Sequence, residues 1–142
     1  MSIVLGPYEI QNIGVPQLWA GAEDSVSPGN LVAAIESPDK KVPVLLVPHS
    51  PDAMALKVQS KLTVELFLGF NPASKKVEFS PTPIVWDVDR SAGEGRYRIK
   101  IPGGGLSWAV DPAAPPGQPI SLLPSDPDSE NQVWKAVLLP QE

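Results

Sequence analysis

The chain has 142 residues, of which 42% are hydrophobic, and a formal net charge of −5. This length and hydrophobic fraction are typical of one globular domain and exclude wholesale disorder. The acidic balance argues against nucleic acid and anionic membrane surfaces, which select basic patches. Because the sequence has no cysteine, disulfides, iron–sulfur clusters and thiolate zinc sites are excluded.

The 18 prolines and 11 glycines argue against long helices and favour short strands joined by loops. The sequence shows neither the pattern of a signal peptide nor an apolar run of about 18 residues, the length of a membrane span. We therefore expect a soluble protein made in the cytoplasm, with secretion by an unconventional route left open.

The N-terminal part is predicted to hold short strands around one long irregular segment. The strands are residues 8–13, 17–21 and 42–47, the last an edge strand because of Pro43. The irregular segment, residues 22–41, has a short apolar centre at 31–35 that fits a strand or one helical turn. Two registers stay open: residues 31–35 form the third strand of this part, or residues 54–59 close it, and we prefer the latter.

Two further groups of strands are predicted after residue 60. The middle group is compact, with strands at residues 62–67, 76–79 and 85–88. The last group is the clearest, because residues 96–101 alternate charged and apolar side chains, with Arg98 expected on the outer face. Gly103–Gly105 supply a hairpin turn. The remaining strands are predicted at residues 106–110, 119–123 and 132–138.

These three parts echo one another. GPYEI at residues 6–10 is matched by GRYRI at 95–99, and LWA at 18–20 is matched at the same spacing by SWA at 107–109. Self-similarity at a period of roughly 45 residues predicts a pseudo-threefold β-trefoil. We expect an all-β domain of twelve strands in three unequal repeats, roughly 6–60, 61–91 and 92–142. The alternative is a β-sandwich whose strands merely look alike.

The segment from Gly117 to Val137, GQPISLLPSDPDSENQVWKAV, resembles the repeat of ricin B-type β-trefoils. The likeness includes a G-x-x-I-x-L pattern and the closing Gln-x-Trp, and it implies that Trp134 lies in the core. It is good over the last third of the chain and faint elsewhere. The layout of the whole chain is similar to small mushroom β-trefoil proteins, which include lectins and protease inhibitors, so the fold alone does not choose a function.

The sequence contains few residues in patterns typical of a catalytic site. The sequence has one histidine, His49, in a proline-flanked turn, and no serine in a nucleophile elbow. One acidic turn is the best metal candidate, but a solvated loop explains its residues better: Asp126, Asp128 and Glu130. Asp87 and Asp89 share a strand face, and nothing places them across a cleft. We expect no enzyme activity, no cofactor and no metal.

The four tryptophans fall into two pairs. Trp86 and Trp134 occupy matching closing strands and are predicted in the core. Trp19 and Trp108 match each other in the second strands, beside turns. Two matched tryptophans are often a repeated core contact, but an exposed indole also offers a face for the C–H groups of a sugar. Trp108 is therefore the candidate stacking residue.

The resemblance implies where a sugar would bind in the last repeat. The Asn-Gln pair that precedes the family's closing Trp is present as Asn131 and Gln132. The family's acid near the second strand is represented by Asp111, two residues late. Leu123 stands where the family has an aromatic ring on the third strand. We predict a single weak carbohydrate site made by Trp108, Asp111, Asn131 and Gln132.

A protease-inhibitor function is the alternative. Residues 22–41 could form an exposed inhibitory loop, because Pro28 and Pro38 reduce the entropy lost when a loop enters a protease cleft. A lysine would suit an acidic pocket such as that of trypsin. The contact residues would be Asn30, Lys40 and Lys41, although a plain solvated loop would look the same.

The sequence thus predicts a non-enzymatic, lectin-like module that binds glycans weakly. A protease inhibitor is the alternative, and a non-catalytic partner subunit is the third interpretation. The expected partners are glycans or a protease, without nucleic acid or membrane insertion, and we expect a monomer.

Overall fold

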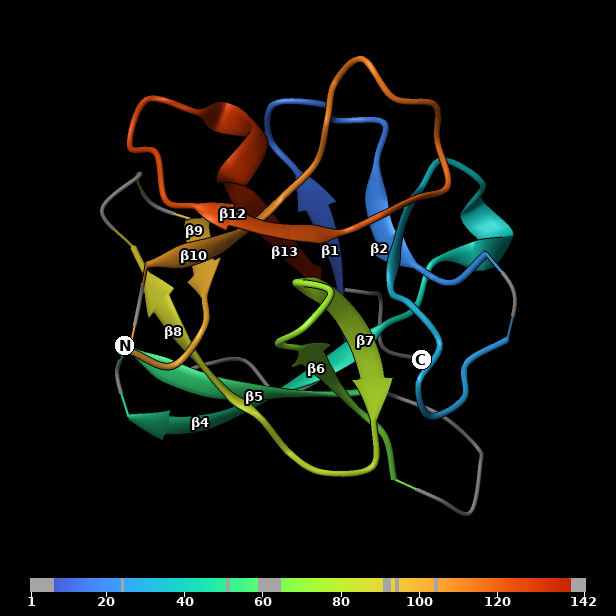
Figure 1. The fold of residues 1–142 in the computed structure, drawn as a ribbon, viewed down its shortest axis with the longest axis vertical. Helices are drawn as coiled ribbons and strands as arrows, with labels where there is room; N and C mark the ends of the chain where they lie inside the picture. Colours follow the sequence, from blue (N-terminus) through green and yellow to red (C-terminus); the bar gives the residue numbers. More distant parts are fainter. Residues whose placement is uncertain are drawn as a thin grey trace.

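The computed structural model describes residues 7–23, 25–50, 52–58, 65–90, 93, 95–103 and 105–138. These residues form thirteen strands and two 3-10 turns (Figure 1). The strands are β1 (Pro7–Asn12), β2 (Trp19–Gly21), β3 (Ala33–Ile35), β4 (Val44–Ser50), β5 (Ala53–Val58), β6 (Phe67–Asn71), β7 (Lys76–Ser80), β8 (Val85–Asp89), β9 (Arg96–Lys100), β10 (Leu106–Ala109), β11 (Gln118–Pro119), β12 (Ser121–Pro124) and β13 (Trp134–Leu138). The turns are η1 (Pro38–Lys40) and η2 (Glu130–Gln132). Within these ranges no helix has the length and apolar character needed to cross a membrane.

Six of the strands pair into a closed antiparallel ring. Around it β1 pairs with β4, β4 with β5, β5 with β8, β8 with β9, β9 with β13 and β13 with β1. Three hairpins, β2–β3, β6–β7 and β10–β12, complete the sheet. A six-stranded barrel with three hairpins is a β-trefoil, which confirms the predicted fold class. The third strand of the last repeat is divided into β11 and β12.

Equivalent hydrogen bonds define the three repeats. In each repeat one such bond joins residues at or next to the facing ends of the first and second strands: Asn12 N to Leu18 O at 3.0 Å, Val58 N to Leu66 O at 2.8 Å and Ile101 N to Leu106 O at 3.1 Å. The three repeats therefore extend from β1 to β4, from β5 to β8 and from β9 to β13. In the second and third repeats the residue of the closing strand that lies opposite the first strand is a tryptophan, Trp86 or Trp134. The equivalent residue of the first repeat is Val44.

The preferred register of the first repeat is wrong, and its alternative is right. β3 is the third strand, paired with β2, and β4 closes the repeat by pairing with β1. Met54 lies opposite Trp86, in the first strand of the second repeat, so the repeat boundary falls near residue 51. Pro43 does not make β4 an edge strand: it precedes the first residue of β4, where its missing N–H costs no ladder bond. Residues 62–64 of the predicted middle strand lie outside the described residues.

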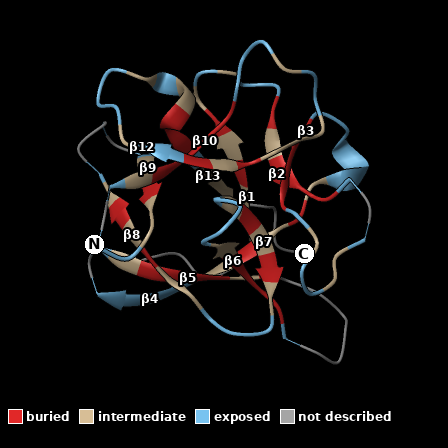
Figure 2. Cartoon of the chain, viewed as in Figure 1, coloured by how far each residue is buried: buried red, intermediate tan, exposed pale blue. Residues whose placement is uncertain are grey.

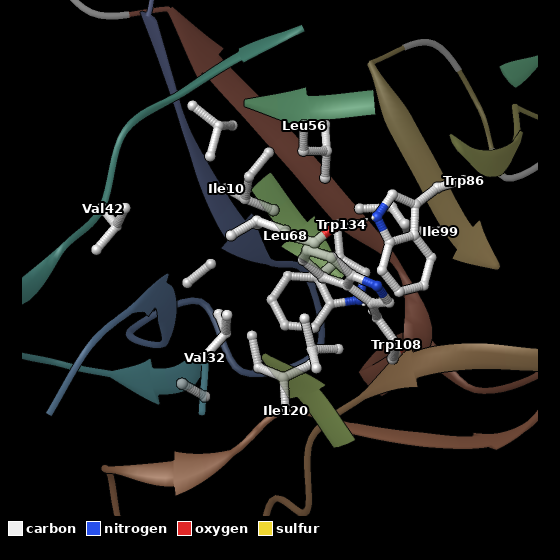
Figure 3. Close-up of a cluster of buried hydrophobic side chains, with 14 of the residues drawn as sticks. Ile10, Val32, Val42, Leu56, Leu68, Trp86, Ile99, Trp108, Ile120 and Trp134 are labelled. Carbon is white, nitrogen blue, oxygen red and sulfur yellow. Dashed lines mark hydrogen bonds between the residues drawn. The ribbon is translucent and has the colours of Figure 1, made fainter. Parts of the chain in front are cut away.

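Buried residues lie along the strands of the barrel (Figure 2), and the core is built around three indoles (Figure 3). Trp108 packs edge-on between Trp86 and Trp134, with ring centroids 5.4 Å and 5.7 Å apart, and all three are fully buried. Trp86 Nε1 donates to Leu68 O at 2.8 Å, and Trp134 Nε1 donates to Trp108 O at 3.1 Å. The predicted core positions of Trp86 and Trp134 are confirmed.

The predicted equivalence of Trp19 and Trp108 is wrong by one residue. Trp19 lies opposite Gln11, as Ser107 lies opposite Lys100, so Trp19 corresponds to Ser107. The cause is the turn between the first two strands, which spans residues 13–17 in the first repeat and is one residue shorter, 102–105, in the third. Because side chains alternate along a strand, a shift of one residue moves a side chain to the other face.

Arg98 lies inward, contrary to the predicted outward position. It is 7% exposed beneath residues 126–129. Its guanidinium donates to three backbone carbonyls, those of Asp126 at 2.9 Å, Pro127 at 2.8 Å and Ser129 at 3.3 Å. Arg98 therefore fixes the loop between β12 and η2 to the barrel.

Candidate functional site

The predicted sugar-stacking residue is inside the protein. Trp108 is 0% exposed and contacts the other two core indoles, so no face of its ring is open to a ligand. Gln132 is also buried: its Oε1 accepts from Asp126 N at 2.8 Å and its Nε2 donates to Pro124 O at 3.0 Å. The prediction that Trp108 stacks on a sugar is wrong, and Gln132 serves the adjacent loop instead.

The other two predicted sugar-site residues make hydrogen bonds within the protein. Asp111 is exposed, and its carboxylate accepts from Ala113 N at 2.9 Å. The Asn131 carbonyl accepts from Asn12 Nδ2 at 2.9 Å and from Val110 N at 3.3 Å. The four residues belong to one repeat, but they offer no exposed aromatic face, because Trp108 is buried. Leu123, at the position of the missing ring, is 47% exposed on β12.

Trp19 is the one half-buried tryptophan, and its face is covered by Lys41. The Lys41 Nζ atom lies 3.6 Å from the ring centroid, a cation–π contact. The same Nζ lies 3.7 Å from Glu9 Oε1, and both side chains are only 17% exposed. Lys41 is therefore held against the barrel by two partners, which opposes the prediction that it projects from an inhibitory loop.

Lys40 belongs to a turn packed tightly onto β2. Its carbonyl accepts from Ala22 N at 3.0 Å, and its Nζ lies 3.4 Å from Glu23 Oε2. Gly21 permits the approach, because a Cβ built there would be 2.2 Å from the Lys40 carbonyl oxygen. The main chain at Lys40 thus faces its own barrel, and the side chain alone is partly exposed.

Residues 22–41 are two loops rather than one. Val32–Ile35 are all buried, at 3% exposure or less, and β3 lies among them. The second loop contains η1 and both lysines. The first loop ends in residues 25–31, here called the tip loop, in which Ser25, Pro28, Gly29 and Leu31 are exposed.

The tip loop is braced from inside. Asn30 N donates to Ser27 O at 3.1 Å, and Gly29 has a φ of +87°, so Pro28 and Gly29 form the corner of a β-turn. The Asn30 side chain turns back and donates from Nδ2 to Ser25 O at 2.8 Å and to Ser25 Oγ at 3.1 Å. Proline, turn and amide together limit the conformations of the loop before any partner binds.

β7 supports the tip loop from behind. Gly29 N donates to Phe79 O, Phe79 N donates to Asn30 O, and Val32 N donates to Val77 O, each at 2.9 Å. Pro28, Gly29 and Leu31 remain exposed. An exposed loop held this way can enter a cleft with little loss of conformational entropy. Of the three predicted contact residues, only Asn30 lies in it, and its amide is directed inward.

Sequence reasoning missed Leu31, which is 39% exposed at the end of the tip loop. The signal was the apolar run LVAAI at residues 31–35, which fitted a strand or one helical turn. The strand begins only at Ala33, and Leu31 makes an isolated bridge to Glu78. The chain enters the barrel between Leu31 and Val32, so that the first residue of this apolar run stays in solvent.

The described residues offer little reactive chemistry. No group of three His, Cys, Asp or Glu side chains in these ranges is arranged to hold a metal ion. The Asp126 carboxylate accepts from Asp128 N at 2.9 Å within its own turn. His49 is exposed on β4.

Comparisons with known proteins give the fold and no more. No family model matches the sequence, and no curated protein matches it. Solved structures that are similar include the designed threefold-symmetric protein ThreeFoil, with a TM-score of 0.74, 18% identity, and coverage of 94% of this chain and 99% of that one.

Two natural structures from mushrooms are similar as well. A Macrolepiota procera ricin B-like lectin in complex with lactose has a TM-score of 0.70 at 16% identity, covering 98% of this chain and 100% of the lectin. A proteinase inhibitor from Coprinopsis cinerea has a TM-score of 0.67 at 16% identity, covering 97% of this chain and 100% of the inhibitor. At these identities the likeness establishes that the chain has the β-trefoil fold.

Proposed function

We propose that the protein is a non-catalytic protease inhibitor that binds its target through the tip loop, residues 25–31. The observation that carries the proposal is the combination of exposure and bracing in this loop. Its corner at Pro28 and Gly29 is in solvent, while Asn30 and β7 hold its backbone from the other side. Preorganisation of this kind is what a loop needs to occupy a protease cleft tightly.

The geometry supports inhibition better than sugar binding. Both functions occur among the similar structures, since one is a lectin with lactose and one is a proteinase inhibitor. The lectin interpretation depended on an exposed ring at Trp108, and that ring is in the core. The inhibitor interpretation depended on an exposed ordered loop, and part of residues 22–41 has that character.

Two glycine substitutions test the proposal against the wild type. Gly29 in the tip loop and Gly103 in the β9–β10 turn have φ values of +87° and +90°, and a Cβ would meet nothing within 4 Å at either position. Alanine at each should therefore cost a similar backbone strain, about 1–2 kcal/mol. We expect the wild type and Gly103→Ala to inhibit at least one member of a panel of chymotrypsin-like, trypsin-like and papain-like proteases, and Gly29→Ala to inhibit it about 10-fold less or worse.

Thermal unfolding is the control for this comparison, and both variants should have the same melting temperature. The proposal fails if the wild type inhibits no protease in the panel, or if the two variants inhibit equally. Binding to a glycan array by a wild type that leaves every protease active would restore the lectin interpretation.

A further inference from the structure

We propose that Leu31 is the side chain that enters the principal pocket of the target, so that the inhibited protease has an apolar pocket rather than an acidic one. This inference rests on the proposed inhibitor function and specifies its target class. It replaces the lysine-based expectation, in which Lys40 or Lys41 would enter a trypsin-like pocket.

The main chain at Leu31 is oriented for pairing with a partner. Leu31 lies opposite Glu78 in an isolated antiparallel bridge, and the hydrogen bonds to β7 are made by its neighbours, Asn30 O and Val32 N. In an antiparallel pair of this kind, the N–H and C=O of the central residue point away from the partner strand. Among the described residues neither group has a hydrogen-bond partner. An extended segment in a cleft could accept and donate there, as in other cases of strand addition.

The side chain of Leu31 is the only large one in the tip loop that is free. Val26 is half-buried against the core cluster, and the Asn30 amide is bonded to Ser25. The exposed stretch ends at Leu31, because Val32 is 1% exposed and the chain enters the barrel there. A partner that follows the loop therefore meets Leu31 last, as the only side chain long enough to fill a pocket.

The lysines are poor alternatives for the same role. Lys41 is committed to Trp19 and Glu9, and the carbonyl of Lys40 is bonded to Ala22 N. Neither residue can present both its main chain and its side chain to a cleft. The isobutyl group of Leu31 is stabilised in an apolar pocket by the hydrophobic effect, whereas a pocket with a carboxylate at its base offers this group no favourable contact.

The test compares inhibition of a chymotrypsin-like and a trypsin-like protease by four proteins: the wild type, Leu31→Ala, Leu31→Lys and Leu123→Ala. Leu123, 47% exposed on β12, is the matched control for the loss of an exposed leucine. We expect the wild type to inhibit the chymotrypsin-like enzyme, and Leu31→Ala to raise its inhibition constant about 10- to 100-fold. Leu31→Lys should weaken that inhibition and create inhibition of the trypsin-like enzyme, while Leu123→Ala should match the wild type.

The outcomes separate this inference from the proposed function. If the wild type inhibits a protease but Leu31→Ala and Leu123→Ala inhibit it equally, Leu31 is not the anchor and the inhibitor function stands. Leu31 is likewise not the anchor, and the inhibitor function stands, if the wild type prefers the trypsin-like enzyme and Lys40→Ala or Asn30→Ala abolishes that inhibition. If the wild type inhibits neither enzyme, nor any other protease of the panel, both proposals fail.

Discussion

Replacing Trp108 and Trp134 separately by phenylalanine compares two indoles of one core cluster that differ in hydrogen bonding. Both side chains are 0% exposed and their rings pack against each other, so the volume lost is the same and the packing penalty is similar. Trp134 Nε1 donates to Trp108 O at 3.1 Å, whereas Trp108 Nε1 is buried without a hydrogen-bond partner in the described part of the chain.

The difference in unfolding free energy follows from that contrast. Trp134→Phe removes a hydrogen bond with a net value of about 0.5–1.5 kcal/mol, and Trp108→Phe removes an unsatisfied donor whose burial costs about 1–3 kcal/mol. We therefore expect Trp134→Phe to be the more destabilising by about 1.5–4.5 kcal/mol, a large part of the roughly 5–15 kcal/mol typical of a domain.

Urea unfolding followed by far-ultraviolet circular dichroism measures both values without depending on tryptophan fluorescence. Equal slopes of free energy against urea would show that the same surface is exposed in each variant. Equal destabilisation of the two variants, or a larger effect at Trp108, would refute the hydrogen-bonding argument.

Three further substitutions test how the loops are attached. Gly21→Ala should destabilise the fold by about 1–3 kcal/mol, because its Cβ would meet the Lys40 carbonyl at 2.2 Å; an unchanged melting temperature would contradict this packing. Arg98→Met should cost about 1–3 kcal/mol and speed hydrogen exchange at residues 126–129, whose carbonyls the guanidinium binds; unchanged exchange there would show that the loop is held otherwise. Asn30→Ala should lower stability by only about 1 kcal/mol yet weaken inhibition, because it releases Ser25; a loss of stability with full inhibition would reverse the role assigned to Asn30.

The fold could be predicted because its signals are local. Alternation along residues 96–101 and the turn glycines identified strands, and the match of GPYEI to GRYRI and of LWA to SWA at one spacing indicated repeats. The register of the first repeat could not be predicted in the same way, because Val44 stands where the other repeats have Trp86 and Trp134. Without the aromatic marker, residues 42–47 and residues 54–59 could both close the repeat, and the preferred register, with residues 54–59, was the wrong one.

The candidate site depended on facts that no local pattern carries. The burial of Trp108 follows from a turn one residue shorter than its counterpart before Trp19, which moves the indole to the inner face. Lys41 looked free because its partners, Trp19 and Glu9, come from strands far away in the sequence. The resemblance of the last repeat to lectins assigned residues to a site by their position in the repeat, and it did not determine which way their side chains point.

Hydrogen–deuterium exchange on the protein alone and in complex with the protease it inhibits most strongly locates the surface that binds. We expect binding to slow exchange in residues 25–31 and in the supporting strand β7, and to leave exchange in residues 111–132 unchanged. Protection confined to residues 111–132, with unchanged exchange in the tip loop, would show that the tip loop is not the binding surface.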